Sequence, residues 1–178
     1  MSLVNKQVLL ASRPAGEPSV DNFKLVETPV PQIADGQVLV RNHFLSLDPY
    51  MRGRMNDAKS YAAPVNLGDV MVGGTAGEVV ASKNPKFAVG EKVVGYLGWQ
   101  LYGVSDGAML MKVDDRHIPL SAYLGSVGMP GVTAWYGLMD ICAPKAGETV
   151  VVTAASGAVG SVVGQLAKMK GCRAVGIA

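Results

Sequence analysis

Cysteine, charge and long apolar runs are all scarce in this sequence, and each scarcity excludes a class of protein. Two cysteines, Cys142 and Cys172, are too few for a disulfide framework or a four-cysteine zinc site. Charged residues make up 17% of the chain, the net charge is +2, and Lys and Arg form no run that would follow a nucleic-acid backbone. No apolar run reaches about 18 residues, and no signal-peptide segment opens the chain. We therefore expect a cytoplasmic protein that binds neither nucleic acid nor membrane.

Short predicted strands, separated by Gly and Pro turns, fill the first part of the chain. Hydrophobic residues make up 49% of the sequence, which is enough for a substantial core. The predicted strands are Gln7–Ser12, Phe23–Glu27, Gln37–Leu45, Glu78–Ser82 and Lys92–Tyr96, with a further loop and strand between Trp99 and Met111. This spacing is typical of a compact β-barrel or sandwich.

A helical period replaces the strand period in the stretch Leu124–Leu138. Pro130 suits the first turn of a helix, and Val132, Trp135 and Tyr136 follow at helical spacing. We place a domain boundary here, with one domain at residues 1–125 and the start of a second at 126–178.

The second domain contains one strand–turn–helix–strand unit. Thr149–Ala154 is an apolar, β-branched strand, the helix runs to Lys170, and Arg173–Ala178 is a second buried strand. The helix carries one apolar face, made of Val159, Val162, Val163, Leu166 and Ala167. We expect a βαβ unit with a right-handed crossover.

The turn of this unit has the dinucleotide-binding form, with Ala155, Gly157 and Gly160 at its three key positions. Gly157 has no Cβ, so the backbone there can approach a pyrophosphate, and Gly160 lets helix and strand pack closely. The helix N-terminus offers N–H groups and a positive dipole end to the phosphates. Ala155 departs from the strict pattern, so a glycine turn in a nucleotide-free α/β protein remains the alternative.

The residue that reads the adenosine ribose usually follows these glycines by about 20 positions. In this sequence that point is Ala178, the last residue. One βαβ unit leaves its parallel strands without helices on both faces. We therefore expect the chain to be the front part of a longer enzyme.

A second informative stretch follows the third predicted strand. Asp48-Pro49 starts a turn or helical turn, from which Tyr50 and Arg52 project, and strand-end loops often carry functional sites. The alternative is that Tyr50 is a packing residue and that Arg52 pairs with an acid. Tyr61 lies in the adjoining loop. His43 has no second His or carboxylate at ligand spacing, so we interpret it as structural.

Four ordered motifs carry a resemblance that covers almost the whole chain. They are Leu47-Asp-Pro-Tyr-Met-Arg52, Val72-Gly-Gly-Thr75, Gly128-Met-Pro-Gly-Val-Thr133 and Ala155-Ser-Gly-Ala-Val-Gly160. With them the chain resembles the N-terminal half of a zinc-independent medium-chain dehydrogenase/reductase. More narrowly, it is similar to the leukotriene B4 12-hydroxydehydrogenase/prostaglandin reductase branch, with its bacterial curcumin reductases and plant alkenal double-bond reductases.

The resemblance implies an α/β protein with a β-rich GroES-like substrate domain, followed by the first βαβ unit of an incomplete Rossmann domain. It implies that Met129, Pro130 and Thr133 line the nicotinamide of NADPH. The pyrophosphate contacts it implies are Gly157, Ala158, Val159 and Gly160. Tyr50 matches the family's substrate-facing tyrosine, and Tyr61 is a weaker substrate-binding candidate.

The implied reaction is reduction of the carbon–carbon double bond of an enone or enal, with hydride passing to the β-carbon. A tyrosine O–H can stabilise the charge that develops on the carbonyl oxygen without being charged itself. We expect a homodimer that acts on a small enone or enal, and no NADPH turnover by residues 1–178 alone.

Three other functions remain open. A zinc alcohol dehydrogenase shares this architecture, but Leu47 or Asp48 fills its catalytic cysteine position and Gly73-Gly74-Thr75 replaces its Gly-His-Glu segment. We therefore expect no metal. A quinone oxidoreductase of the same superfamily would differ in giving one-electron products. A nucleotide-binding module without catalysis would bind NADPH and reduce no enone.

Overall fold

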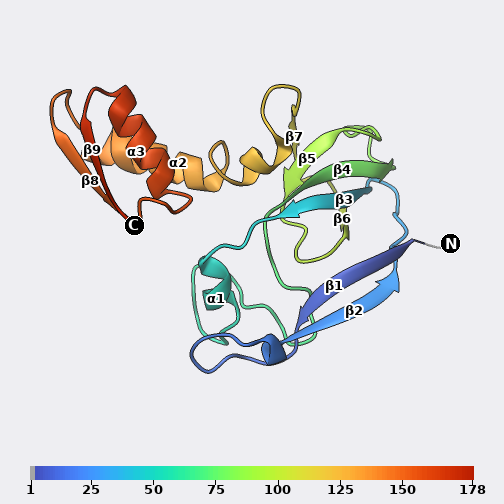
Figure 1. Cartoon of the computed structure of the whole chain (residues 1–178). Coiled ribbons are helices and arrows are strands. Elements are labelled where there is room, and N and C mark those ends of the chain that lie inside the picture. Colours follow the sequence, from blue (N-terminus) through green and yellow to red (C-terminus); the bar gives the residue numbers. More distant parts are fainter. Residues whose placement is uncertain (1–2) are drawn as a thin grey trace. The chain divides into compact units, whose positions relative to one another are not determined.

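The computed structural model describes residues 3–178, which form two compact units divided between Leu120 and Ser121 (Figure 1). The first unit is built mainly of strands, and the second joins helices to two parallel strands. The predicted α/β fold with a β-rich first part is therefore confirmed. No helix in the described part of the chain is long and apolar enough to cross a bilayer.

A five-stranded sheet is the main body of the first unit. Its strands lie in the order β6-β3-β4-β5-β7, and each neighbouring pair is antiparallel. Their bounds are β3 Val38–Leu45, β4 Thr75–Ser82, β5 Lys92–Gly95, β6 Tyr102–Ser105 and β7 Met111–Val113. The buried core against this sheet consists of Val38, Val40, Val79, Phe87 and Val93. Alternating apolar residues on neighbouring strands thus supply one packed face.

A two-stranded ribbon belongs to the same unit and is held to the rest of it by backbone hydrogen bonds. It consists of β1, Val4–Leu10, paired with β2, Phe23–Pro29. The 3₁₀ turn Val20–Asn22 directly precedes β2. Val8 N–H donates to the Trp99 carbonyl, and Met71 N–H donates to the Val8 carbonyl, both at 2.9 Å. β2 runs through Pro29, past the predicted end at Glu27. Proline is tolerated there because, within residues 3–178, β2 pairs with β1 alone, so its other edge needs no donor.

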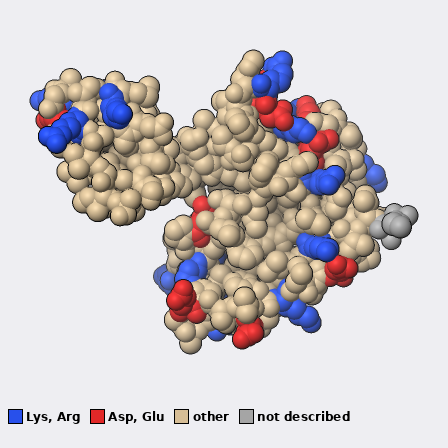
Figure 2. Space-filling view, in the orientation of Figure 1, with Lys and Arg blue, Asp and Glu red and all other residues tan. Residues whose placement is uncertain are grey.

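Charged side chains of the first unit are interspersed rather than gathered by sign (Figure 2). Several form exposed or half-exposed ion pairs across strands, such as Lys6 with Glu27 and Lys112 with Glu91. Such pairs contribute little to stability, but mixed signs leave no basic stripe on the face shown.

The second unit begins in the 3₁₀ segment Leu120–Leu124, which spans the division between the units, and continues into α2, Met129–Trp135. Sequence reasoning found a helical period from Leu124 and placed Pro130 in the first turn of the helix. Residues 125–128 form hydrogen-bonded turns, the helix starts at Met129, and Pro130 lies in its first turn as predicted. A π-helical segment, Tyr136–Cys142, follows and ends at Ala143, whose φ is +44°.

The predicted strand–turn–helix–strand unit is present. β8, Thr149–Thr153, pairs in parallel with β9, Arg173–Ile177, and α3, Gly160–Met169, connects them. Leu138, Ala167 and Cys172 are buried together, with Val163 and Leu166 packed against them. Four of the five residues predicted on the apolar face of α3 are buried or half-buried, while Val159 precedes the helix and is 38% exposed.

Candidate functional site

The first part of the candidate site lies at one edge of the five-stranded sheet. Leu45 is paired with Thr75, and Thr75 is paired with Gly95, so the ends of β3 and β5 lie in one row with the start of β4. Ser46 N–H donates to the Gly74 carbonyl at 2.9 Å and extends this row by one residue. The chain that leaves β3 toward Tyr50 and the chain that leaves β5 at Tyr96 therefore emerge at the same edge.

Gly73 allows this edge to be closely packed. A Cβ built on Gly73 would lie 2.8 Å from Leu45 Cδ1, 3.0 Å from Trp99 Cδ1 and 3.1 Å from Met51 Cε. The glycine that stands in the zinc-ligand segment of the alcohol dehydrogenases is thus surrounded by apolar side chains. A ligating side chain at this position would need all three neighbours to move.

Tyr50 opens the short helix α1, Tyr50–Arg54, and is half-buried. It packs against a core cluster made of Leu10, Met51, Met55, Val65 and Met71. Burial raises the pKa of the Tyr50 hydroxyl above its ordinary value of 10.0. The Asp48 carboxylate and Tyr96 raise that pKa further, while the Arg54 guanidinium lowers it. The hydroxyl is thus held neutral, as a hydrogen-bond donor must be. Tyr50 both packs and faces charged groups, so the two interpretations of Tyr50 are compatible.

The approach to α1 is fixed by a local hydrogen bond. The Ser46 hydroxyl donates to Asp48 Oδ1 at 2.9 Å, and Met51 N–H donates to the Asp48 carbonyl at 3.1 Å. These bonds hold the Asp48 carboxylate beside the start of α1.

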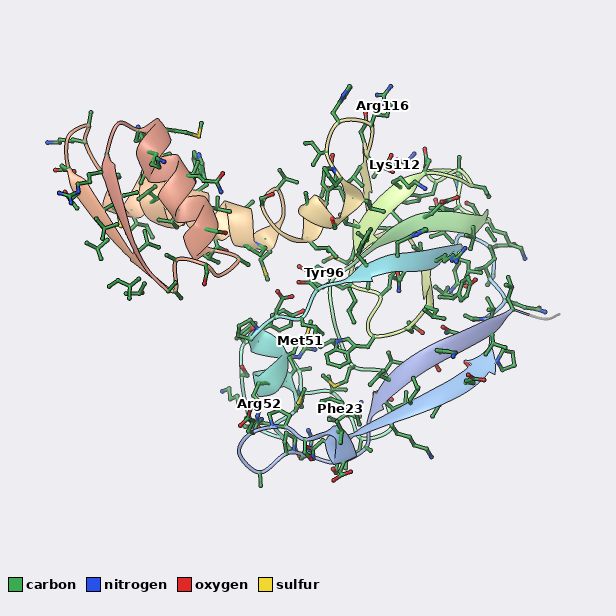
Figure 3. The ribbon with its side chains drawn as sticks, viewed as in Figure 1. Phe23, Met51, Arg52, Tyr96, Lys112 and Arg116 are labelled. Carbon is green, nitrogen blue, oxygen red and sulfur yellow. The ribbon has the colours of Figure 1, made fainter. Side chains whose placement is uncertain are left out.

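Arg52 has a structural function. Its Nε and Nη2 donate to the Gly16 carbonyl at 2.9 and 2.7 Å, and Nη2 also donates to the Pro14 carbonyl at 3.2 Å. The alternative in which Arg52 pairs with an acid is therefore wrong, because its partners are backbone carbonyls and Asn56. Arg52 ties the loop after β1 to α1, and Figure 3 shows it at the outer side of that helix.

Tyr61 and Tyr96 complete the aromatic groups near Tyr50. Tyr61 lies in the loop after α1 with 85% of its surface exposed, and Tyr96 follows β5 with 61% exposed. Both raise the pKa of Tyr50, so both hydroxyls lie within electrostatic reach of it. Sequence reasoning treated Tyr96 only as the end of a strand. Its place beside the end of β3 follows from the register across β3, β4 and β5, which no single segment of the sequence contains.

His43 lies on β3 with Nε2 3.9 Å from the Glu78 carboxylate, which also accepts a hydrogen bond from Lys92. The Lys92 hydrogen bond lowers the pKa of Glu78. No cluster of three His, Cys, Asp or Glu residues with metal-site spacing occurs within residues 3–178.

The second part of the candidate site is the turn from β8 to α3. Ala154, at the end of the strand, has φ +49°, an uncommon conformation for a residue with a Cβ. Its carbonyl accepts the Gly157 N–H at 2.9 Å. A Cβ on Gly160 would lie 2.3 Å from that carbonyl oxygen, so only glycine fits the start of α3. Gly160 thus lies close to the backbone of Ala154, the turn residue directly after β8.

Gly157 differs from Gly160 in its surroundings. A Cβ on Gly157 would have one neighbour within 4 Å, the Ala154 oxygen at 3.2 Å, and would otherwise point into open space. Among the hydrogen bonds of the described chain, none uses the backbone N–H of Ala158 or Val159. The turn therefore combines an open approach at Gly157 with backbone donors available to an anion.

The first position of the turn is coupled to β9. Ala155 N–H donates to the Ile177 carbonyl at 3.0 Å, and a Cβ on Gly176 would lie 2.8 Å from the Ala155 Cβ. Gly176 was not singled out from the sequence. Its absent side chain makes room for alanine where the strict pattern has glycine.

The residues predicted at the nicotinamide lie on α2. Met129 is 48% exposed at its start, Pro130 is buried, and the Thr133 hydroxyl donates to the Met129 carbonyl at 2.7 Å. With its proton used within the helix, Thr133 still offers its oxygen as an acceptor.

Comparison with known proteins agrees with this geometry. Residues 6–113 match the family described as the N-terminal domain of oxidoreductase. The chain is 54% identical to NADPH-dependent curcumin reductase from Escherichia coli over 174 residues, which cover 98% of this chain and 50% of that protein. It is 49% identical to rat prostaglandin reductase 1, covering 92% of this chain and 48% of that protein.

A solved structure, CurA from Vibrio vulnificus in complex with NADPH, superposes with a TM-score of 0.89 at 53% identity. The match covers 96% of this chain and 51% of CurA. The chain thus spans about half the length of the curated relatives it matches. The matched domain and these relatives confirm the predicted resemblance: the chain belongs to the oxidoreductase N-terminal-domain family, in the branch that contains the curcumin and prostaglandin reductases.

Proposed function

We propose that the full-length protein is an NADPH-dependent reductase of the carbon–carbon double bond of α,β-unsaturated ketones and aldehydes. The observation that carries this proposal is Tyr50, a half-buried tyrosine held neutral at the sheet edge where β3 and β5 end. The names of the relatives, NADPH-dependent curcumin reductase and prostaglandin reductase 1, support the same reaction class.

The turn between β8 and α3 fits the pyrophosphate of NADPH. Gly157 leaves open space where a side chain would stand, and the N–H groups of Ala158 and Val159 are available as donors. Gly160 keeps the start of α3 against the Ala154 carbonyl and so fixes the direction of those donors. We assign Met129, Pro130 and Thr133 on α2 to the nicotinamide side. In this proposal residues 1–125 form the substrate domain and 126–178 begin the cofactor domain.

When bound, NADPH supplies the hydride that adds to the β-carbon of the substrate. Negative charge then develops on the carbonyl oxygen. Tyr50 donates a hydrogen bond to that oxygen and stabilises the enolate, and a positioned donor of this kind acts more strongly in a site shielded from water. The raised pKa of Tyr50 keeps the proton on the phenol, so the residue donates a hydrogen bond without losing its proton. A proton from solvent water then adds to the α-carbon and completes the reduction. Tyr61, from the loop after α1, is assigned to the substrate side.

Steady-state assay of the full-length protein with NADPH and benzalacetone tests the proposal. NADPH deuterated at the transferred position should place deuterium on the β-carbon of the saturated ketone. NADPH binding without reduction of any enone would contradict the proposal and favour a nucleotide-binding module. One-electron products from quinones, with no enone reduction, would favour a quinone oxidoreductase.

A further inference from the structure

We propose that Tyr96 is a specificity-determining residue, whose ring contacts the β-carbon substituent of the enone while Tyr50 engages its carbonyl oxygen. This inference rests on the proposed function and names the residue that contacts the substituent on the β-carbon. It concerns the first unit alone.

The register of the sheet places Tyr96 beside the segment that carries Tyr50. Gly95, the last residue of β5, is paired with Thr75, and Thr75 is paired with Leu45, the last residue of β3. Because β3 and β5 both run antiparallel to β4, they run in the same direction and their chains leave the sheet at one edge. Strands next but one to each other are about 10 Å apart, which is the span of a small conjugated molecule. Figure 3 shows Tyr96 at this edge, beside the end of β3.

The side chain of Tyr96 has no structural task that explains its position. It is 61% exposed and belongs to none of the three core clusters. No hydrogen bond of its hydroxyl occurs within the described residues. Tyr96 is also one of the groups that raise the pKa of Tyr50, so its hydroxyl lies within electrostatic reach of that residue. An exposed aromatic ring next to a neutral donor offers apolar area that a ligand can bury.

The backbone beside Tyr96 is firmly held. A Cβ on Gly95 would lie 2.7 Å from Leu110 Cδ1, and a Cβ on Gly103 would lie 2.7 Å from the Leu97 Cβ. Both neighbours of Tyr96 in the chain are therefore closely packed, so its ring projects from a rigid support. This is the arrangement that positions a contact residue well.

There is also room for a substituent next to this ring. Tyr96 lines a hollow of about 340 Å³ in the first unit together with Leu97, Met109 and Leu110. Its other lining residues, Gln37, Val104, Ser105 and Asp106, extend it toward the start of β3. That volume is in the range of small-molecule sites. The hollow therefore offers space beside the ring of Tyr96.

The test compares two enones that differ only in this substituent, ethylideneacetone with a methyl group and benzalacetone with a phenyl group on the β-carbon. In the full-length protein, Tyr96→Ala should raise KM for benzalacetone about tenfold, the loss expected for one aromatic contact. The kinetic constants for ethylideneacetone should change less than about twofold, since its methyl group buries little of the ring. Tyr96→Phe should keep the wild-type KM for benzalacetone, because the ring and not the hydroxyl makes the contact.

Leu25→Ala is the matched control, since Leu25 is 67% exposed on β2 and takes no part in this edge. It should leave both substrates unaffected. Equal losses for both enones in Tyr96→Ala, or no loss for benzalacetone, would overturn the inference while leaving the proposed function intact. A wild-type protein that reduces neither enone would overturn both, and is recognised before any variant is compared.

Discussion

Gly176 on β9 lies directly against Ala155 at the first position of the turn after β8, where a Cβ on Gly176 would stand 2.8 Å from the Ala155 Cβ. The strict dinucleotide pattern has glycine at the position of Ala155. In this chain Gly176 on the neighbouring strand has no side chain, which leaves room for the Ala155 Cβ. The alanine at the first position of the turn motif is therefore accommodated by a glycine on β9.

This pair gives the first prediction. Gly176→Ala should destabilise the protein by about 1–3 kcal/mol, because neither the methyl group nor the Ala155 Cβ can rotate away. Ala155→Gly removes one side of the conflict, so the double variant should recover about 1 kcal/mol relative to additivity. Urea denaturation of the four proteins of this cycle measures the coupling. Purely additive effects would show that the two positions do not compete for space.

The second prediction separates the two glycines of the turn. Gly157→Val should weaken NADPH binding strongly with little change in melting temperature, because its side chain would enter open space on the ligand side. Gly160→Val should cost about 2 kcal/mol or more in stability, because its Cβ would overlap the Ala154 carbonyl. Isothermal titration with NADPH and thermal melts distinguish the two cases. Unchanged NADPH affinity in Gly157→Val would refute the assignment of the phosphate turn.

The third prediction concerns the buried hydrogen bonds between Asn5 on β1 and Tyr102 at the start of β6. Asn5 is fully buried, its Nδ2 donates to the Tyr102 carbonyl at 2.9 Å, and its Oδ1 accepts the Tyr102 N–H at 2.9 Å. Asn5→Ala leaves both backbone groups without a partner, at a cost of about 3 kcal/mol. Gln7→Ala removes a half-buried side chain whose Nε2 donates to Gln100 Oε1 at 2.7 Å, and it should cost about 1 kcal/mol. Equal urea midpoints for the two variants would contradict this account.

Sequence reasoning predicted the elements that depend on local pattern. The strand–turn–helix–strand unit, the helix with Pro130 in its first turn and the short strands of the first part all follow from periodicity and turn residues. It missed Gly176 and Tyr96, because both matter through a neighbouring strand, and register across strands is not written in one segment. Its alternative of an acidic partner for Arg52 is wrong, since backbone carbonyls from a distant loop leave no trace in composition. The assignments of Tyr50, Tyr61 and the cofactor residues remain predictions.

The fourth prediction addresses the donor role of Tyr50. Tyr50→Phe in the full-length protein should lower kcat/KM for benzalacetone about a hundredfold, the effect of losing about 3 kcal/mol of stabilisation at a developing oxyanion. NADPH affinity should stay near wild type. The melting temperature should change little, because the ring still packs against the core cluster that contains Met51 and Met55. Kinetics equal to wild type would leave Tyr50 as a packing residue only.

The last prediction uses the pH dependence of the same hydroxyl. Tyr50 donates a hydrogen bond only while it is protonated, so activity should fall as the pH rises through its pKa, which lies above 10.0. Asp48 is the second cause of the raised pKa, after burial. Asp48→Asn removes the negative charge but keeps an oxygen for the Ser46 hydroxyl, so the geometry before α1 is preserved. The alkaline limb of kcat/KM should therefore move to lower pH in this variant.

Asp57→Asn is the control for this shift. Asp57 is exposed in the loop after α1 and does not contribute to the pKa of Tyr50. Its substitution should leave the alkaline limb in place. The difference in tyrosinate absorbance between wild type and Tyr50→Phe, followed against pH, identifies the titration of Tyr50 directly. Because burial is the larger cause, the limb in Asp48→Asn should move only part of the way toward the ordinary tyrosine value. A limb at the same pH in Asp48→Asn and wild type, with circular dichroism showing both folded, would mean that Tyr50 is not the group that limits activity.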